Sequence, residues 1–294
     1  MPQPLAGSPA PAVMCFPGSA SSKELLAGEL EQRAEQPPNG HPIGNQMALQ
    51  YVQAGFIAVV AENPGVGELD ECPVGAPKNV NSGRDKLCAE LIALGRNYVG
   101  LSVFQKLHIL DWLCGQSWLD TSCIAVSGHS LGTEPAMMMA VLDDRIGALV
   151  FNDYLTHNRS LYASAGKQLK RWSHQASPLW HVIPGMLAEF DFPDLLAALA
   201  PTPLLITEGG PEALLRRVAG AYELASAGTN FEYHYYPMYS QAADRTSDGV
   251  WPPPVGMTDD EWMRFANVDA PSHCFHGDVA VPWLTRALRM PLPG

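Results

Sequence analysis

The stretch Ile124-Ala-Val-Ser-Gly-His-Ser-Leu-Gly-Thr-Glu-Pro-Ala-Met-Met-Met-Ala-Val-Leu142 joins a short apolar run to helix-forming residues through a Gly-x-Ser-x-Gly turn. The order strand, sharp turn, helix is that of a nucleophile elbow, where a serine stands above the end of a sheet strand. Gly128 and Gly132 flank Ser130 because side chains there would collide with the adjoining strand and helix. The pattern predicts that Ser130 is a nucleophile, and the alternative is an ordinary serine in a surface turn.

Apolar runs on both sides of this stretch predict further strands. Continuous runs of this kind are typical of parallel strands covered on both faces, and they lie at residues 13–16, 56–61, 147–151 and 203–207, while residues 231–236 alternate like a last strand. Between residues 87 and 113 apolar residues recur at helical spacing, and we expect Trp112 and Trp118 near its end to pack in the core. The sequence therefore predicts an α/β fold with a mostly parallel sheet.

Length and charge exclude several classes of protein. The 294 residues, 47% of them hydrophobic, suit one large α/β domain with a sizeable core. A net charge of -12 argues against nucleic acid or an anionic membrane surface as a partner, since both favour clustered Lys and Arg. No apolar run reaches the roughly 20 residues of a membrane span, and the first residues lack the features of a signal peptide. We expect a cytoplasmic protein that binds a small molecule and no membrane.

The six cysteines show no C-x-x-C pairing, which argues against a zinc site and a disulfide framework. Only Cys72 and Cys88, both in loop-like sequence, remain a candidate pair. The residues His273, Cys274, His276 and Asp278 lack further ligands at suitable spacing, so we expect no metal site there.

Three stretches together carry a family resemblance. The turn Gly-His-Ser-Leu-Gly132, the Pro17-Gly18 loop after an apolar strand, and the late Ser-His-Cys-Phe-His-Gly277 stretch resemble the α/β-hydrolase superfamily. The chain looks most like its dienelactone-hydrolase-like and acetyl-xylan-esterase-like serine esterases, from about residue 13 to 288. The resemblance implies one α/β-hydrolase domain over 1–294, with cap-like excursions at about 156–200 and 237–270. We expect the sheet to lack the first two strands of that fold.

The resemblance also implies a catalytic triad around Ser130. The general base lies on the loop before the final helix, which places it at His273. The acid follows the strand at 203–207, and Glu212 ends a Gly-x-x-Glu spacing that matches the family's Gly-x-x-Asp. Glu208 is the alternative acid. We expect Asp153 to be structural or to line the pocket, one strand too early for the acid.

Backbone N–H groups complete the implied site. In the family, one donor to the oxyanion hole comes from the residue after the nucleophile and one from the loop after an early strand. Here these are Leu131 and either Ala20 or Ser19. We expect His276 to support or cap the base loop.

These residues predict a carboxylesterase that cleaves short-chain acyl esters through an acyl-enzyme, without a metal or organic cofactor. The same fold could instead act on acetylated carbohydrate, a dienelactone or an acyl-peptide. A further alternative is a hydrolase-like binding protein that has lost activity. Because the sheet begins late, its exposed edge predicts a homodimer or an N-terminal coil folded over the edge, unless loops blunt it.

Overall fold

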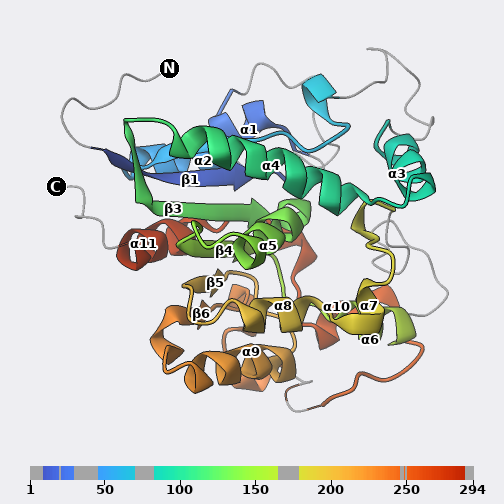
Figure 1. Ribbon diagram of the computed structural model, residues 1–294. Helices are drawn as coiled ribbons and strands as arrows, with labels where there is room; N and C mark the ends of the chain where they lie inside the picture. The colour runs from blue at the N-terminus through green and yellow to red at the C-terminus, as the bar shows by residue number, and fades with distance from the viewer. Residues whose placement is uncertain are drawn as a thin grey trace.

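A computed structural model describes residues 9–19, 21–29, 46–69, 83–164, 179–245, 248 and 250–288 of the chain. Within them, six parallel strands form one sheet in the order β2-β1-β3-β4-β5-β6 (Figure 1). The strands are β1 (Ala10–Phe16), β2 (Ile57–Val60), β3 (Leu119–His129), β4 (Ala148–Asn152), β5 (Leu204–Ile206) and β6 (Phe231–Tyr233). All six predicted strands are present, and no strand precedes β1 among the described residues.

Alternation along the inner strands divides the core into two layers. Met14 and Val126 pair in register on β1 and β3 and belong to one apolar cluster. Their neighbours Val13 and Ala125, also in register, belong to the other. Because successive side chains of a strand point to opposite faces, both faces of the sheet are covered. This explains why the fully buried parts of the inner strands, residues 12–16 and 124–126, are apolar.

Helices form the layers on the two faces. One cluster includes residues of α4 (Tyr98–Cys114), α5 (Thr133–Leu142), α8 (Phe192–Ala198) and α9 (Glu212–Leu224). The other includes residues of α1 (Lys23–Ala27), α2 (Met47–Gln53) and α11 (Gly277–Ala287). Figure 1 shows α4 and α5 in front of the sheet. The α/β-hydrolase fold expected from the sequence is confirmed.

The helical spacing over residues 87–113 is divided between two helices. α3 (Gly83–Ala93) ends before Gly95, which has a φ of +68°, and α4 begins after Asn97. The Asn97 side chain caps α4 by accepting the Gly100 N–H at 2.7 Å. No single helix among the described residues is long and apolar enough to cross a membrane. Taken together, α3 and α4 have the length and composition of a membrane span, but the pair is bent by 97°.

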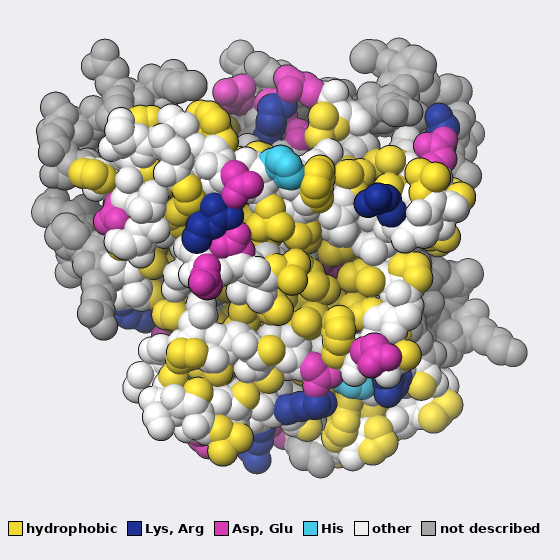
Figure 2. Space-filling model, in the orientation of Figure 1, with side chains coloured by type: hydrophobic (Ala, Val, Ile, Leu, Met, Phe, Trp, Pro, Cys, Tyr) yellow, Lys and Arg dark blue, Asp and Glu magenta, His cyan; other side chains and the backbone are white. Residues whose placement is uncertain are grey.

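The core expectation for the two tryptophans is half right. Trp118 packs against the larger apolar cluster, whereas Trp112 on α4 is 54% exposed. Phe104 on the same helix and Leu142 on α5 are also more than half exposed. Figure 2 shows apolar side chains across the middle of the face that carries these helices. Leu110 and Leu113 in the same turn are fully buried, so Trp112 lies on the outer side of the helix.

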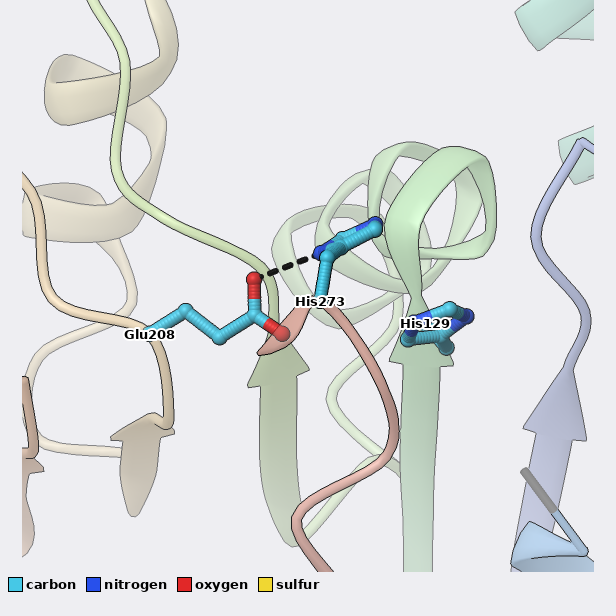
Figure 3. A group of neighbouring side chains, drawn as sticks. All are labelled: His129, Glu208 and His273. Atoms are coloured by element: carbon cyan, nitrogen blue, oxygen red, sulfur yellow. Dashed lines mark hydrogen bonds and ion pairs between the residues drawn. The ribbon is translucent and has the colours of Figure 1, made fainter. Parts of the chain in front are cut away.

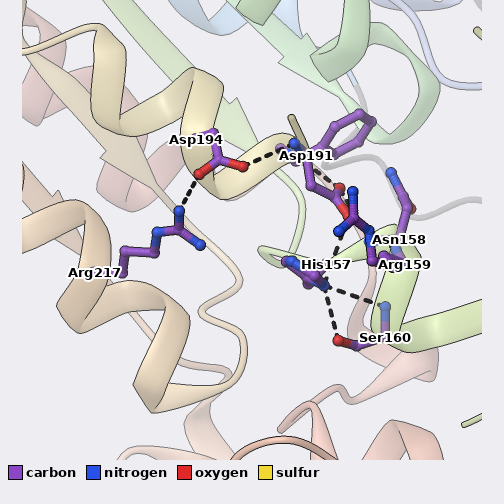
Figure 4. A network of polar contacts seen from close by, with 8 residues as sticks. His157, Asn158, Arg159, Ser160, Asp191, Asp194 and Arg217 are labelled. Carbon is purple, nitrogen blue, oxygen red and sulfur yellow. Dashed lines mark hydrogen bonds and ion pairs between the residues drawn. The ribbon is translucent and has the colours of Figure 1, made fainter. Parts of the chain in front are cut away.

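The first excursion, between β4 and β5, is tied together at its ends. Among its described residues it holds α6 (Asn158–Ser164), α7 (Met186–Glu189) and α8. The Asp191 carboxylate, at the start of α8, accepts the Asn158 and Arg159 N–H groups of α6 at 3.1 and 2.9 Å (Figure 4). Asp194 in turn pairs with Arg217 of α9. One buried carboxylate therefore satisfies orphan N–H groups of two helices.

The second excursion packs on the first. Its helix α10 (Asp259–Phe265) contributes Trp262 and Phe265 to an aromatic cluster that also contains Leu161 of α6. The Trp251 ring meets His157 edge-on at 5.5 Å. The two excursions thus pack on each other, and the cap that they were expected to form stays a prediction. Residues 1–8 lie outside the described residues, so the covering of the sheet edge by a coil or a second copy stays a prediction.

Candidate active site

Ser130 occupies a strained turn between β3 and α5. Its φ of +51° lies in the left-handed region, which is uncommon for a residue other than glycine. β3 ends at His129 and α5 begins at Thr133, whose hydroxyl donates to the Ser130 carbonyl at 2.6 Å. The strand, turn and helix have the order predicted for a nucleophile elbow.

Close backbone contacts explain the glycines around Ser130. A Cβ on Gly132 would overlap the Phe16 carbonyl at the end of β1, and one on Gly128 would overlap the Gly132 carbonyl. Gly18, just beyond β1, is less crowded but still close, because its added Cβ would lie 3.2 Å from the Ser130 Cβ. The pairing of β1 with β3 thus brings the loop after β1 against the serine.

The predicted base, His273, bonds to a carboxylate on a neighbouring strand end. Its Nδ1–H donates to Oε2 of Glu208 at 2.7 Å (Figure 3). His273 precedes α11, and Glu208 lies two residues after β5. The Glu208 side chain is fully buried and also accepts from the Tyr236 hydroxyl. Asn152, at the end of β4, donates to Glu208 at 3.5 Å.

The pairing of Glu208 with His273 moves their two pKa values in opposite directions. Burial works to raise the pKa of Glu208, but the charge and hydrogen bond of His273 outweigh it and lower that pKa to about 2. Burial lowers the pKa of His273, yet the Glu208 charge and hydrogen bond raise it to about 9. Glu208 is therefore an anion at neutral pH that favours the protonated imidazole.

Glu212 does not lie where we expected it. It begins α9, where its carboxylate accepts from Arg216 Nε at 2.8 Å and from the Tyr235 hydroxyl. Gly209 and Gly210, with φ of +65° and +137°, turn the chain between Glu208 and Glu212. The expected contact of Glu212 with His273 is corrected by the structure, because the alternative residue Glu208 makes it.

His129 completes the cluster around the base. Its ring stacks on His273 with centroids 4.7 Å apart, and Figure 3 shows it at the end of its strand. Donor atoms of His129, Glu208 and His273 lie within 4.8 Å of one another, a grouping that could hold a metal ion. The Glu208 carboxylate already accepts from His273 Nδ1, which is the geometry of an acid that orients a base.

Two further sequence candidates support the site. His276 donates its N–H to Asn152 at 2.9 Å and places Nε2 3.3 Å from Glu208, so it steadies the base loop. Asp153 follows β4, and its carboxylate accepts the Tyr154 N–H. Burial raises the pKa of Asp153 to about 7, opposed by the charge of His273.

The structure describes some of the residues that we expect to form the oxyanion hole. Leu131 follows Ser130 and its side chain is buried, while Ala20 lies outside the described residues. Ser19, the alternative, is described. Sequence reasoning missed Asn152 and Tyr236 as partners of the base loop and its acid. Asn152 ends β4 and Tyr236 follows β6, so both lie at the carboxyl edge of the sheet, and that position was the available signal.

Comparison with known proteins extends these findings. A family model described as the abhydrolase family matches residues 2–286. A crystal structure from Bacteroides fragilis, described as a "putative acetyl xylan esterase", is 32% identical with a TM-score of 0.86 over 96% of this chain and 72% of that one. A methylesterase is 16% identical with a TM-score of 0.52 over 85% of this chain and 47% of its own, a likeness of fold alone. No protein with curated function matches significantly.

Proposed function

This chain belongs to the α/β-hydrolase family, and on that premise we propose that it is a serine esterase acting on short-chain acyl esters. One observation carries the proposal: the His273–Glu208 hydrogen bond of 2.7 Å at the edge of the sheet where Ser130 stands in its strained turn. The proposed nucleophile and acid then follow the ends of β3 and β5, and the proposed base lies on the loop before α11, in the chain order Ser130, Glu208, His273.

The proposed first step forms an acyl-enzyme. Ser130 Oγ attacks the ester carbonyl carbon while its proton passes to His273 Nε2. Glu208, ionised because its pKa is about 2, keeps the bond to Nδ1 and stabilises the imidazolium. The protonated His273 then gives its proton to the departing alcohol oxygen as the ester bond breaks.

The second step repeats the chemistry with water. His273 takes a proton from a water molecule as the water oxygen attacks the acyl carbon. The Ser130–acyl bond breaks, Ser130 recovers its proton and the carboxylic acid leaves. In both steps we assign stabilisation of the negative tetrahedral oxygen to N–H groups of Leu131 and the loop after β1.

We propose that the two excursions cover the site and so limit the size of the substrate. The two excursions pack on each other through Trp251 and His157, next to aromatic residues that adjoin the acid and base. Such a covered site favours small acyl groups. A second candidate is an acetylated carbohydrate, favoured by the 32% identical relative described as a putative acetyl xylan esterase.

Hydrolysis of nitrophenyl esters of increasing acyl length, beside acetylated xylan, tests both candidates. The Ser130→Ala variant should fold normally and lose about a millionfold in turnover, as is typical when a triad nucleophile is removed. Thr133→Ala, next to the elbow but outside the triad, is a control for local damage. A Ser130→Ala enzyme with a tenth of wild-type activity would rule out this nucleophile.

A further inference from the structure

Two buried side chains hold the loop that follows β1. Asn63 Nδ2 donates to the Pro17 carbonyl at 2.8 Å, and Arg84 Nη2 donates to the Ser19 carbonyl, also at 2.8 Å. Asn63 is fully buried and Arg84 is only 7% exposed. The donors come from the end of β2 and from α3, far from the loop in sequence.

These hydrogen bonds decide which side of the loop faces the nucleophile. Gly18 lies between the two held carbonyls and packs against Ser130 and His129. A trans peptide is planar, with its C=O and N–H on opposite sides, so a donor that holds the carbonyl also orients the N–H of the same peptide group. Carbonyls held by Asn63 and Arg84 cannot turn toward a negative oxygen on the substrate.

Arg84 also keeps a positive charge beside this loop. Among the residues that the structure describes, no carboxylate lies within 4.0 Å of its guanidinium, and its buried Nε has no hydrogen-bond partner. The guanidinium instead lies 4.8 Å from the Trp180 ring centroid, on the turn Leu179–His181 of the first excursion. Burying a cation is costly, and the described contacts that offset this cost are the hydrogen bond to the Ser19 carbonyl and the Trp180 ring.

We propose that Arg84 is a positioning residue for oxyanion stabilisation, acting through the Ser19 carbonyl. A cationic donor holds that carbonyl oxygen more firmly than a neutral donor would, so the carbonyl stays turned away from the negative oxygen of the intermediate. The charge also favours the negative tetrahedral intermediate over the neutral ester. This inference rests on the proposed esterase function and adds to it the residue that sets the loop.

The test compares Arg84→Met with Arg96→Met, which removes an exposed arginine between α3 and α4. Steady-state kinetics with nitrophenyl acetate should give Arg84→Met a kcat about 10- to 100-fold lower at similar KM, below the loss for a direct oxyanion donor. Affinity for an arylboronic acid, which forms a tetrahedral adduct with the serine, should fall by a similar factor. Arg96→Met should match wild type in both.

A kcat within twofold of wild type, or a loss of kcat with unchanged boronate affinity, overturns the proposal. If Arg84→Met does not fold, Arg84→Lys decides: it keeps the charge but not the guanidinium geometry, and should still lose about tenfold in kcat. Wild-type activity and the Ser130→Ala loss are measured first. An inactive wild type refutes the proposed function, whereas an active wild type with an unaffected Arg84 variant refutes only this inference.

Discussion

The rings of His129 and His273 stack 4.7 Å apart with their planes 28° from parallel. His129 is buried at the end of β3, directly before Ser130. The strand that leads to Ser130, the proposed nucleophile, therefore also supports one face of His273, the proposed base, while Glu208 bonds to its Nδ1 edge. Base orientation thus depends on two separate contacts, which substitutions can separate.

We predict that His129→Ala lowers kcat about tenfold, because His273 loses a packing surface but keeps its bond to Glu208. His129→Phe, which retains a ring to stack, should keep most of the activity. Steady-state kinetics on both variants checks this. Equal losses in the two variants would show that stacking is not what matters at this position.

Glu208→Gln should reduce turnover far more than Glu212→Gln. An amide cannot stabilise the imidazolium, and the loss for a triad acid is about ten-thousandfold. Glu212→Gln is the matched control, since that carboxylate bonds to Arg216 and Tyr235 instead. The acid assignment fails if Glu212→Gln is the slower enzyme or if Glu208→Gln stays within tenfold of wild type.

The pH dependence should report the charge of Glu208. His273 accepts a proton only when neutral, so kcat/KM rises as pH passes through its pKa, which the neighbouring anion raises to about 9. Glu208→Gln removes that anion and leaves burial, which lowers the pKa. The rising limb of the residual activity should then move down by about one pH unit or more. A limb that stays in place contradicts the coupling.

Activity should fall steeply with acyl length and be highest for roughly two to four carbons, because we propose that the two excursions cover the site compactly. The nitrophenyl ester series measures this directly. Acetylated xylan as a better substrate than nitrophenyl acetate would favour the carbohydrate candidate. Long-chain esters as the best substrates would contradict a compact pocket.

Local sequence determined the elbow and the base loop. Gly128, Ser130 and Gly132 must lie on a sharp turn because backbone crowds the positions where side chains would project. Apolar runs determined the strands, since both faces of this sheet are buried. His273 followed from its place before the last helix, through the family resemblance.

Tertiary structure alone decided which carboxylate meets His273 and which side chains hold the loop after β1. Glu208 and Glu212 lie four residues apart. Their spacing does not show where each carboxylate points, because Gly209 and Gly210 turn the chain into α9. Arg84 reaches Ser19 across 65 positions of sequence, through packing that no local pattern encodes. Short-range sterics can be inferred from neighbouring residues, whereas side-chain direction and long-range contact depend on how the whole sheet and its helices assemble.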